Sequence, residues 1–370
     1  MHLVSPCEHP QQSYWQSLYE LTSVLVYSLH FNSASYTPEY RKTCVEMATK
    51  FRGEYTTGKE VVEAFKDRVA GKTIIITGPS AGGVGSETAL SLALGHPRQL
   101  ILTGRDASKI TPVIASIQEI DSSIDAQFVQ LDLGSQASVR AAAATIRKLV
   151  GGHTIDILIN NAGVMAPPYG LTEDGIERQF ATNHIGHFLL TNLLMDKILH
   201  RGARVVNLAS IGHVFAEANY DDLTYKNGET YDPWVAYSHS KSANMLFTLS
   251  LKEKLGARGL YAFSVQPGSV ESNLMRHVTD DNDSLASAWN LLNNAIREHG
   301  DHLGHRKTVQ EGCATSLVAA LDPALEQHNG AYLNHAAIDP VPLRPWVRDV
   351  ALADKLWSLS EDLVGQKFSV

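Results

Sequence analysis

The pair Tyr237 and Lys241, in the run YSHSK, has the residue types and the spacing that proton transfer needs. On a helix, residues four positions apart lie on one face, so the phenol and the ammonium would lie side by side. A free tyrosine titrates near pH 10, and a neighbouring ammonium lowers that pKa because it stabilises the phenolate. The pair therefore predicts a general acid and base. The same spacing also occurs by chance in surface pairs, so the neighbouring motifs matter.

Ser210 supplies a further group for this chemistry. It ends the run RVVNLAS, whose apolar residues predict a strand over 204–208. Sites in parallel sheets are built at the carboxyl ends of the strands, which places Ser210 at that edge. Its hydroxyl can hold a substrate carbonyl there.

A glycine-rich stretch, IIITGPSAGGVGS, follows the first apolar run and precedes a helix-like segment. In a doubly wound fold this is where a dinucleotide binds, because glycines let the backbone approach the pyrophosphate and the helix N-terminus attracts its charge. A plain turn is the alternative for such a motif taken alone. The residues predicted to contact the cofactor here are Gly78, Ser80, Gly83, Val84 and Gly85.

The end of the second apolar run bears on the choice of cofactor. An NAD site usually has a carboxylate at this point, whereas here Gly104 is followed at once by Arg105. A guanidinium can pair with a 2′-phosphate, so the sequence favours NADP over NAD. Asp106 complicates this interpretation, although it could instead cap the next helix. The alternative for Arg105 is a solvated charge.

From residue 72 onward, short apolar runs alternate with helix-length segments. Such runs are typical of strands that are buried on both faces, in a parallel sheet flanked by helices. The sequence therefore predicts an α/β, doubly wound (Rossmann) sheet of about seven strands with helices on both faces. We expect one domain over 71–370, and a mostly helical N-terminal extension over 1–70. The predicted strands are 72–77, 100–103, 127–131, 155–160, 204–208, 262–266 and 330–333.

Composition narrows the class of protein. The net charge is −8 and no basic stripe is present, which argues against a nucleic-acid partner. The three cysteines are far apart, so neither a disulfide framework nor a zinc site is expected, and a reducing, cytoplasmic location fits. The apolar stretch 21–31 is shorter than the about 20 residues of a spanning helix. It predicts a packed helix, with membrane association as the weaker alternative.

Taken together, the motifs resemble the short-chain dehydrogenase/reductase family, in its retinol-dehydrogenase-like branch. The motifs occur in the order of that family. They are the glycine loop, LDL, NNAG, the helix asparagine in TNHIGHFLLTNLL, RVVNLAS, YSHSKSANMLF and the PG after the tyrosine helix. The resemblance implies an NADP-dependent oxidoreductase that transfers a hydride between nicotinamide and a lipophilic alcohol, ketone or aldehyde. Its partner would be that small molecule. The alternative is a catalytically silent nucleotide-binding scaffold or sensor of the same fold.

The resemblance also implies residue roles. Tyr237 would be the acid and base, Lys241 would lower its pKa and bind the nicotinamide ribose, Ser210 would polarise the carbonyl, and Asn183 would hold a relay water. The remaining contacts would be made by Asp132 and Leu133 at the adenine, Asn161 at the adenosine ribose, and Val270 with Ser272 at the nicotinamide end. Asn183 could also satisfy backbone groups where its helix bends.

Several features depart from the family pattern or stay open. Four residues separate Gly78 from Gly83 where the family usually has three, so either Gly82 or Gly83 could be the turn glycine. The segment 271–306 is predicted to be a substrate lid, with an ordinary packed helix as the alternative. No metal site is expected among the histidines near the motifs. The branch often has a membrane anchor near the N-terminus, and this chain has no clear one. A homo-oligomer stays possible.

Overall fold

A parallel sheet forms the centre of the molecule. The computed structural model describes residues 51, 53–272, 274, 284–299, 305–339 and 343–369. Within them the strand order is β3-β2-β1-β4-β5-β6-β7-β8, and every pairing is parallel except that of β7 with β8. The strands are β1 Thr73–Thr77, β2 Gln99–Gly104, β3 Asp125–Gln130, β4 Ile157–Asn160, β5 Arg204–Leu208, β6 Tyr261–Val265, β7 Tyr332–Asn334 and β8 Ala337–Ile338.

The predicted fold is confirmed, and the structure adds one strand to it. The seven predicted runs correspond to β1 through β7, whereas β8 has only two residues, too few to form a recognisable apolar run. Every residue of β1, β4 and β5 is buried, as expected for strands covered on both faces. The edge strand β3 instead alternates exposed and less exposed residues.

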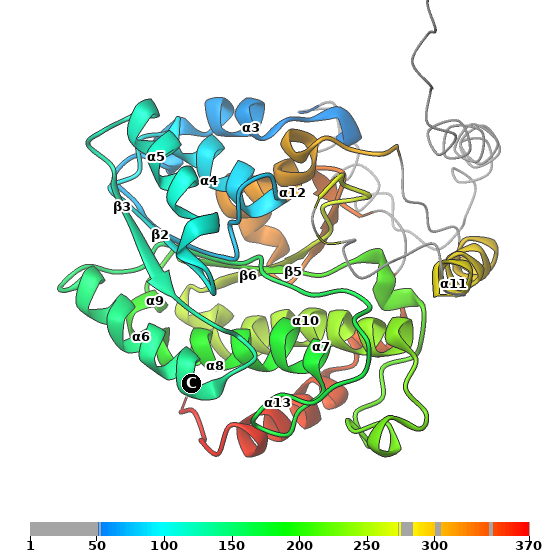
Figure 1. Cartoon of the computed structure of the whole chain (residues 1–370). Helices are drawn as coiled ribbons and strands as arrows, with labels where there is room; N and C mark the ends of the chain where they lie inside the picture. Colours follow the sequence, from blue (N-terminus) through cyan, green and yellow to red (C-terminus); the bar gives the residue numbers. More distant parts are fainter. Residues whose placement is uncertain are drawn as a thin grey trace, which may run out of the picture.

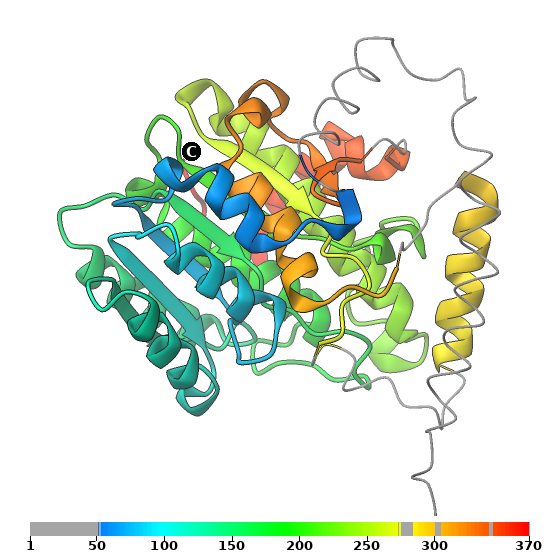
Figure 2. The same cartoon turned by 90° about the horizontal axis from the view of Figure 1, so that it is seen from above.

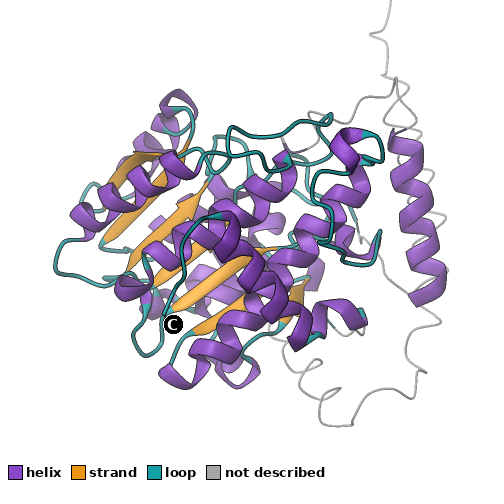
Figure 3. Cartoon of the chain, turned by 90° about the horizontal axis from the view of Figure 1, so that it is seen from below, coloured by secondary structure: helices purple, strands orange, loops and turns teal. Residues whose placement is uncertain are grey.

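Helices cover both faces of the sheet (Figures 1 and 3). On one face lie α3, α4, α5 and α12, and on the other α6, α7, α8 and α10, with α13 outside α10 (Figure 1). The helices are α3 Gly58–Ala64, α4 Val84–Ala93, α5 Thr111–Ile120, α6 Gln136–Val150, α7 Arg178–Phe180, α8 Gly186–Leu193, α9 Met195–Ile198, α10 Pro233–Leu255, α11 Ser284–His299, α12 Val309–Leu321 and α13 Val350–Leu363.

Local sequence sets the start of the helix that bears Tyr237. Asp232 caps α10, because its carboxylate accepts hydrogen bonds from the backbone N–H groups of Trp234 and Val235. Pro233 occupies the first helical position, where a missing N–H costs nothing. Asp232 and Pro233 thus fix the register of α10, and with it the position of Tyr237 in the helix.

Both ends of the described chain pack against this framework. The α3 helix lies so close to α12 that a Cβ added at Gly58 would be 2.8 Å from Leu317 Cδ1. At the other end, Trp357 of α13 packs edge-on against Phe188, with ring centroids 5.0 Å apart. The helix α13 therefore covers the outer side of α8 and α10.

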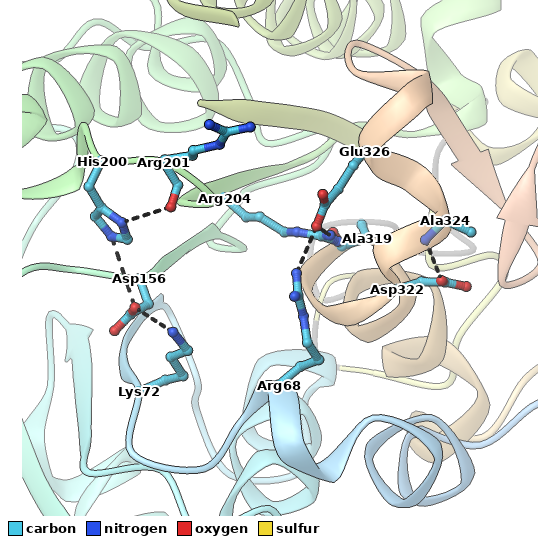
Figure 4. Close-up of polar contacts among 10 residues, drawn as sticks. All are labelled: Arg68, Lys72, Asp156, His200, Arg201, Arg204, Ala319, Asp322, Ala324 and Glu326. Atoms are coloured by element: carbon cyan, nitrogen blue, oxygen red, sulfur yellow. Dashed lines mark hydrogen bonds and ion pairs between the residues drawn. The ribbon is translucent and has the colours of Figure 1, made fainter. Parts of the chain in front are cut away.

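A buried arginine ties three elements together at the amino ends of the strands (Figure 4). Arg204 of β5 donates to the carbonyl of Ala319 in α12 at 3.0 Å, and its other nitrogen is 3.3 Å from Glu326. Glu326 also pairs with the half-exposed Arg68 at 2.8 Å. Asp322 in this region accepts from the Ala324 N–H. Arg204 therefore satisfies a carbonyl near the end of α12 that has no partner in its own helix.

Parts of the sequence predictions lie outside the described residues. These are most of the N-terminal extension, including the stretch 21–31, and part of the predicted lid. In the chain as described, no helix combines the length and the apolar character needed to cross a membrane. The cytoplasmic location and the homo-oligomer remain predictions.

Candidate active site

The predicted site residues gather at the carboxyl ends of four neighbouring strands. The glycine loop follows β1, Asn161 follows β4, Ser210 follows β5, and the segment from Gln266 follows β6. Because β1 and β4 are adjacent while their sequence neighbours lie on opposite sides, the chain reverses its direction of winding there. A doubly wound fold binds its ligand at this reversal point.

The glycine loop is shaped by two residues with left-handed backbone. Gly78 and Gly82 have φ values of +65° and +76°, which side chains other than glycine rarely adopt. Gly83 instead is extended and caps α4. Of the two candidates for the turn glycine, Gly82 is thus the one with the left-handed backbone, and Gly83 begins the helix.

The loop fits the pyrophosphate of a dinucleotide. A Cβ added at Gly78 would be 2.8 Å from the Ala162 side chain, and one at Gly85 would collide with Asn161 and be 3.0 Å from Pro79 Cα. The backbone is therefore packed as closely as glycine allows. The first N–H groups of α4, including that of Val84, have no acceptor within their own helix and can bind an anion.

Asn161 supports the same loop from the end of β4. Its side-chain amide donates to the carbonyls of Thr77 at 2.7 Å and Gly78 at 3.3 Å. Ser80 lies on the other side, where its carbonyl accepts from the Gly83 N–H at 3.1 Å. The predicted contacts on this loop thus come from one compact turn between β1 and α4.

The end of β2 presents cations and no free carboxylate. Arg105 is exposed and forms no hydrogen bond or ion pair among the described residues. Asp106 caps the short helix that follows, because it accepts from the N–H of Ser108 at 2.9 Å and from its hydroxyl at 2.7 Å. Lys109 lies against the glycine loop, since its carbonyl accepts from the Ala81 N–H at 3.0 Å.

Asp132 and Leu133 follow β3 on the same edge of the sheet. Asp132 Oδ1 accepts from the Gly134 N–H at 2.9 Å, which fixes the turn after the strand. Leu133 is buried, and its backbone crosses α8 at Gly186, where an added Cβ would be 2.9 Å from Leu133 Cα. The glycine of the NHIGH run therefore permits the close approach of this turn.

Ser210, Tyr237 and Lys241 meet between β5 and α10. The Ser210 hydroxyl accepts from the Gly212 N–H at 3.1 Å and lies close enough to the Tyr237 phenol to lower the pKa of that group. Lys241 Nζ is 5.6 Å from the centroid of the Tyr237 ring and donates to the Leu208 carbonyl at 2.9 Å. Asn244 donates to the same carbonyl at 2.9 Å. The end of β5 is therefore fixed to α10 on the face that bears the predicted catalytic residues.

Burial has the largest effect on the acidity of this pair. It raises the pKa of Tyr237 to about 12, while the nearby Ser210 hydroxyl acts in the opposite direction. Burial also lowers the pKa of Lys241 to about 8. We expected Lys241 to lower the pKa of the phenol, but the loss of water around the phenol outweighs any such effect in the protein alone. At pH 7 the two groups are a neutral phenol and an ammonium.

Asn183 lies where the helix before α8 widens. Residues Ala181–Ile185 form a π-helix, which is a frequent feature of functional sites. The Asn183 side chain accepts from the Val164 N–H at 2.8 Å and donates to the Val164 carbonyl at 3.0 Å and to Ser240 Oγ at 2.9 Å. The predicted structural role of Asn183, satisfying backbone groups at a helix irregularity, is therefore observed.

The loop after β6 reaches the start of α12. Val270 pairs with Lys307 as an isolated bridge, and a Cβ added at Gly312 would be 3.0 Å from Val270 Cγ1. Ser272 is the last described residue before the gap at 273, and its hydroxyl accepts from the Leu274 N–H at 3.5 Å. Both residues thus lie in the segment that follows β6.

An apolar cluster surrounds the Tyr237 ring. The rings of Trp234 and Tyr237 are perpendicular with centroids 6.4 Å apart, and Phe215 packs edge-on against Trp234 at 6.0 Å. From α11, which lies at one edge of the molecule (Figures 1 and 2), Ala288 and Leu291 pack against the same cluster. The members are Met165, Ala166, Trp234 and Tyr237, with Phe215, Leu274, Ala288 and Leu291 packed against them. This position of α11 is compatible with the predicted lid.

Histidines near the motifs are bonded within the protein. His213 bonds the Ser210 carbonyl at 2.7 Å, His239 bonds the Tyr225 hydroxyl at 3.0 Å, and His184 bonds Ser360 Oγ at 2.9 Å. Within the described ranges, no group of three or more His, Cys, Asp or Glu could hold a metal ion.

Two residues at the site were missed by the sequence analysis. Thr77 and His187 bond each other across 110 positions of sequence at 2.8 Å. Gly78 and Asn183 are their near neighbours in sequence, and only the tertiary structure brings the two side chains together. The repeated histidine in NHIGH, four residues after Asn183, was the available signal.

The fold and the arrangement of these residues define the chain as a doubly wound protein whose glycine loop, residues 78–85, forms a cradle suited to a dinucleotide. Comparison with known proteins gives the family. Residues 72–221 match the model described as short chain dehydrogenase. Retinol dehydrogenase 11 of Mus musculus is 36% identical over 299 residues, which are 80% of this chain and 88% of the relative. Short-chain dehydrogenase/reductase prx1 of Penicillium roqueforti is 34% identical over 308 residues, 80% of this chain and 85% of the relative.

Solved structures agree with this assignment. An uncharacterised protein of Mycobacterium paratuberculosis superposes with a TM-score of 0.60 at 31% identity, over 81% of this chain and 96% of that chain. The chain therefore belongs to the short-chain dehydrogenase/reductase family, in its retinol-dehydrogenase-like branch. It is accordingly an oxidoreductase that acts on CH–OH groups with NAD(P).

Proposed function

We propose that this chain is an NADP(H)-dependent enzyme that interconverts a lipophilic alcohol and its ketone or aldehyde, with Tyr237 as the general acid and base. The proposal rests on one observation, that Tyr237, Ser210 and Lys241 lie together at the carboxyl end of β5, at the same edge of the sheet as the glycine loop. When bound, the dinucleotide supplies or accepts the hydride.

Tyr237 and Ser210 would act on the substrate oxygen together. The neutral phenol can donate a proton to a carbonyl oxygen, because burial keeps it protonated at pH 7. The Ser210 hydroxyl, which lies near the phenol, can donate to the same oxygen and hold it in place. Lys241 would favour the phenolate that forms, since an ammonium stabilises a nearby negative charge. Asn183 would hold the relay water that the family pattern implies.

Three observations support the choice of NADP as cofactor. Arg105 has no competing partner among the described residues, and the Asp106 carboxylate is already occupied by Ser108. Lys109, whose backbone carbonyl bonds the glycine loop, is a second cation in this region. A 2′-phosphate would thus meet positive charge, and the 2′-hydroxyl of NAD would find no free carboxylate.

The apolar cluster around Tyr237 supports a lipophilic substrate. Its members carry no charged group, so an ionic substrate would lose its hydration there without compensation. Trp234 and Phe215 offer flat apolar surface to a hydrocarbon chain or ring.

The test is to incubate the purified chain with NADPH and a panel of apolar and charged aldehydes and ketones. We expect NADPH consumption with apolar members. Tyr237→Phe should lower turnover by about 100-fold or more while NADPH still binds, because general acid catalysis alone is removed. Binding of NADPH without consumption by any member of the panel would contradict the proposal and favour a silent scaffold.

The cofactor preference has its own measurement. Arg105→Ala should weaken NADPH binding by about tenfold and leave NADH binding unchanged, since only the charged contact with the 2′-phosphate is lost. Equal effects on both dinucleotides would refute this role of Arg105.

A further inference from the structure

His187 lies between the two halves of the site, on the first turn of α8. Its side chain is 2% exposed. Nε2 is 2.8 Å from Thr77 Oγ1 at the end of β1, and Nδ1 is 3.0 Å from the backbone carbonyl of Asn183 in the π-helix. Both ring nitrogens are therefore used, one toward each half.

The partners determine which nitrogen carries the proton. The Asn183 carbonyl can only accept, so Nδ1 must donate to it. Burial lowers the pKa of His187 to about 4, so the ring is neutral at pH 7 and Nε2 is an acceptor. The Thr77 hydroxyl therefore donates to Nε2, and its oxygen accepts from the Ala162 N–H at 2.9 Å. The direction of every hydrogen bond in this series is therefore determined.

At its Thr77 end, this series of hydrogen bonds reaches the dinucleotide cradle. Thr77 immediately precedes Gly78, and its carbonyl accepts from Asn161 at 2.7 Å. Ala162, bonded to the Thr77 hydroxyl, is also the residue that packs against Gly78. A shift of Thr77 would therefore move both Gly78 and Asn161.

The Asn183 end leads to the helix of Tyr237 and Lys241. The Asn183 side chain donates to Ser240 Oγ at 2.9 Å, and Ser240 donates to the Tyr237 carbonyl at 2.8 Å. A Cβ added at Gly163 would be 3.2 Å from Asn183 Oδ1 and 3.5 Å from Lys241 Nζ, so both side chains lie against Gly163. The orientation of Asn183 thus bears on the proton-transfer residues.

We propose that His187 is a positioning residue that links the dinucleotide cradle to the Tyr237 helix through its bonds to Thr77 and Asn183. The inference rests on the proposed function, because it assigns consequences for NADPH binding and turnover to the two bonds. The Thr77 bond controls dinucleotide affinity, and the Asn183 bond controls turnover.

Two substitutions separate the two bonds. His187→Asn keeps an N–H that can reach the carbonyl four residues earlier, as Asn192 does toward Phe188 at 2.9 Å in the same helix. It is too short to reach Thr77. His187→Gln places its amide oxygen near the position of Nε2, so it keeps the acceptor for Thr77 and loses the donor to Asn183.

The measurements are the Kd for NADPH, by fluorescence titration without substrate, and kcat with a carbonyl compound that the wild type reduces. For His187→Asn we expect the Kd to rise about fivefold to tenfold with little change in kcat, the effect of one buried hydrogen bond. For His187→Gln we expect kcat to fall by about the same factor with the Kd unchanged. A matched control is His184, equally buried one turn earlier, whose Asn and Gln variants should change only thermal stability.

A double-mutant cycle with Thr77 tests the link directly. Thr77→Val should raise the Kd, Thr77→Ser should restore it, and adding His187→Asn to Thr77→Val should raise it no further, because both changes remove one bond. Additive effects, or His187 variants that match the His184 controls in Kd and kcat, would overturn the proposal. A wild type that does not bind NADPH would instead contradict the proposed function.

Discussion

Replacement of Lys241 by methionine is predicted to stabilise the protein while it removes the proposed chemistry. The ammonium is buried, and its hydrogen bond among the described residues is to the Leu208 carbonyl at 2.9 Å. That carbonyl also accepts from Asn244 at 2.9 Å, so it keeps a partner in the variant. Methionine has similar length and no charge, and it suits a buried position beside the Tyr237 ring.

The magnitude follows from the lowered pKa of Lys241. Burial lowers it from 10.5 to about 8, and each pKa unit corresponds to about 1.4 kcal/mol. At pH 7 the buried charge thus costs about 3 kcal/mol of unfolding free energy. Loss of the hydrogen bond to Leu208 destabilises the variant by about 1 kcal/mol. The net gain in unfolding free energy for Lys241→Met is therefore about 2 kcal/mol.

The sign of the pH dependence follows from linkage. Between pH 8 and 10.5 the unfolded wild type binds more protons than the folded one, so its stability rises with pH in that window. The variant lacks this group and shows no such rise. Its advantage over the wild type should therefore be full below pH 8 and shrink as the pH increases.

The assay is urea unfolding followed by tryptophan fluorescence, at pH 7 and at about pH 9.5. We expect Lys241→Met to be more stable by about 2 kcal/mol at pH 7 and close to the wild type at pH 9.5. Lys252→Met, on the same helix with its side chain 41% exposed, is the control and should change stability by less than about 0.5 kcal/mol. A Lys241→Met protein less stable than the wild type at pH 7, or a gain equal at both pH values, would refute the reasoning.

Three further predictions concern stability and binding. Arg204→Met should lower the unfolding free energy, measured in urea, by about 2–4 kcal/mol, because it leaves the buried Ala319 carbonyl unpaired (Figure 4). Arg68 is half-exposed, so Arg68→Met should lower it by less than about 1 kcal/mol. Similar losses in the two variants would contradict this prediction. Burial lowers the pKa of His184 to about 3, so its neutral ring contributes stability above pH 6.5 that is lost as the pH falls toward 3. His184→Gln should therefore flatten the fall in thermal stability between about pH 7 and pH 5. An unchanged dependence of thermal stability on pH would count against this prediction. Gly85→Ala should weaken NADPH binding by about tenfold or more in titration, since an added Cβ would collide with Asn161, while Gly152→Ala, with open space around it, should bind normally.

The strands and the places of Tyr237, Lys241 and the glycine loop in the fold were predictable because each has a local signature. Buried parallel strands need near-continuous apolar runs, and β1 through β7 all begin and end within three residues of the predicted bounds. The spacing of Tyr237 and Lys241 and the glycines before α4 are likewise set by helix geometry and by the close approach of backbone. The antiparallel β8 had no such signature, since two residues carry no periodicity.

Interactions between distant segments had to come from the structure. Thr77 and His187 are 110 residues apart, and neither has a sequence neighbour that indicates the other. The occupation of Asp106 by Ser108 was one of two alternatives in the sequence, and the hydrogen bonds observed at 2.9 and 2.7 Å distinguish between them.

By itself, the sequence determined the doubly wound sheet and the position of the glycine loop, because periodicity and spacing along one chain encode them. Its resemblance to a known family indicated the four residues of the predicted chemistry. Only the tertiary structure decided how acidic those residues are and what holds them. The pKa of Tyr237 depends on how much water its surroundings exclude, and that is set by Trp234, Met165 and α11 packed around the ring. Burial is a property of the assembled fold, and no local pattern specifies it.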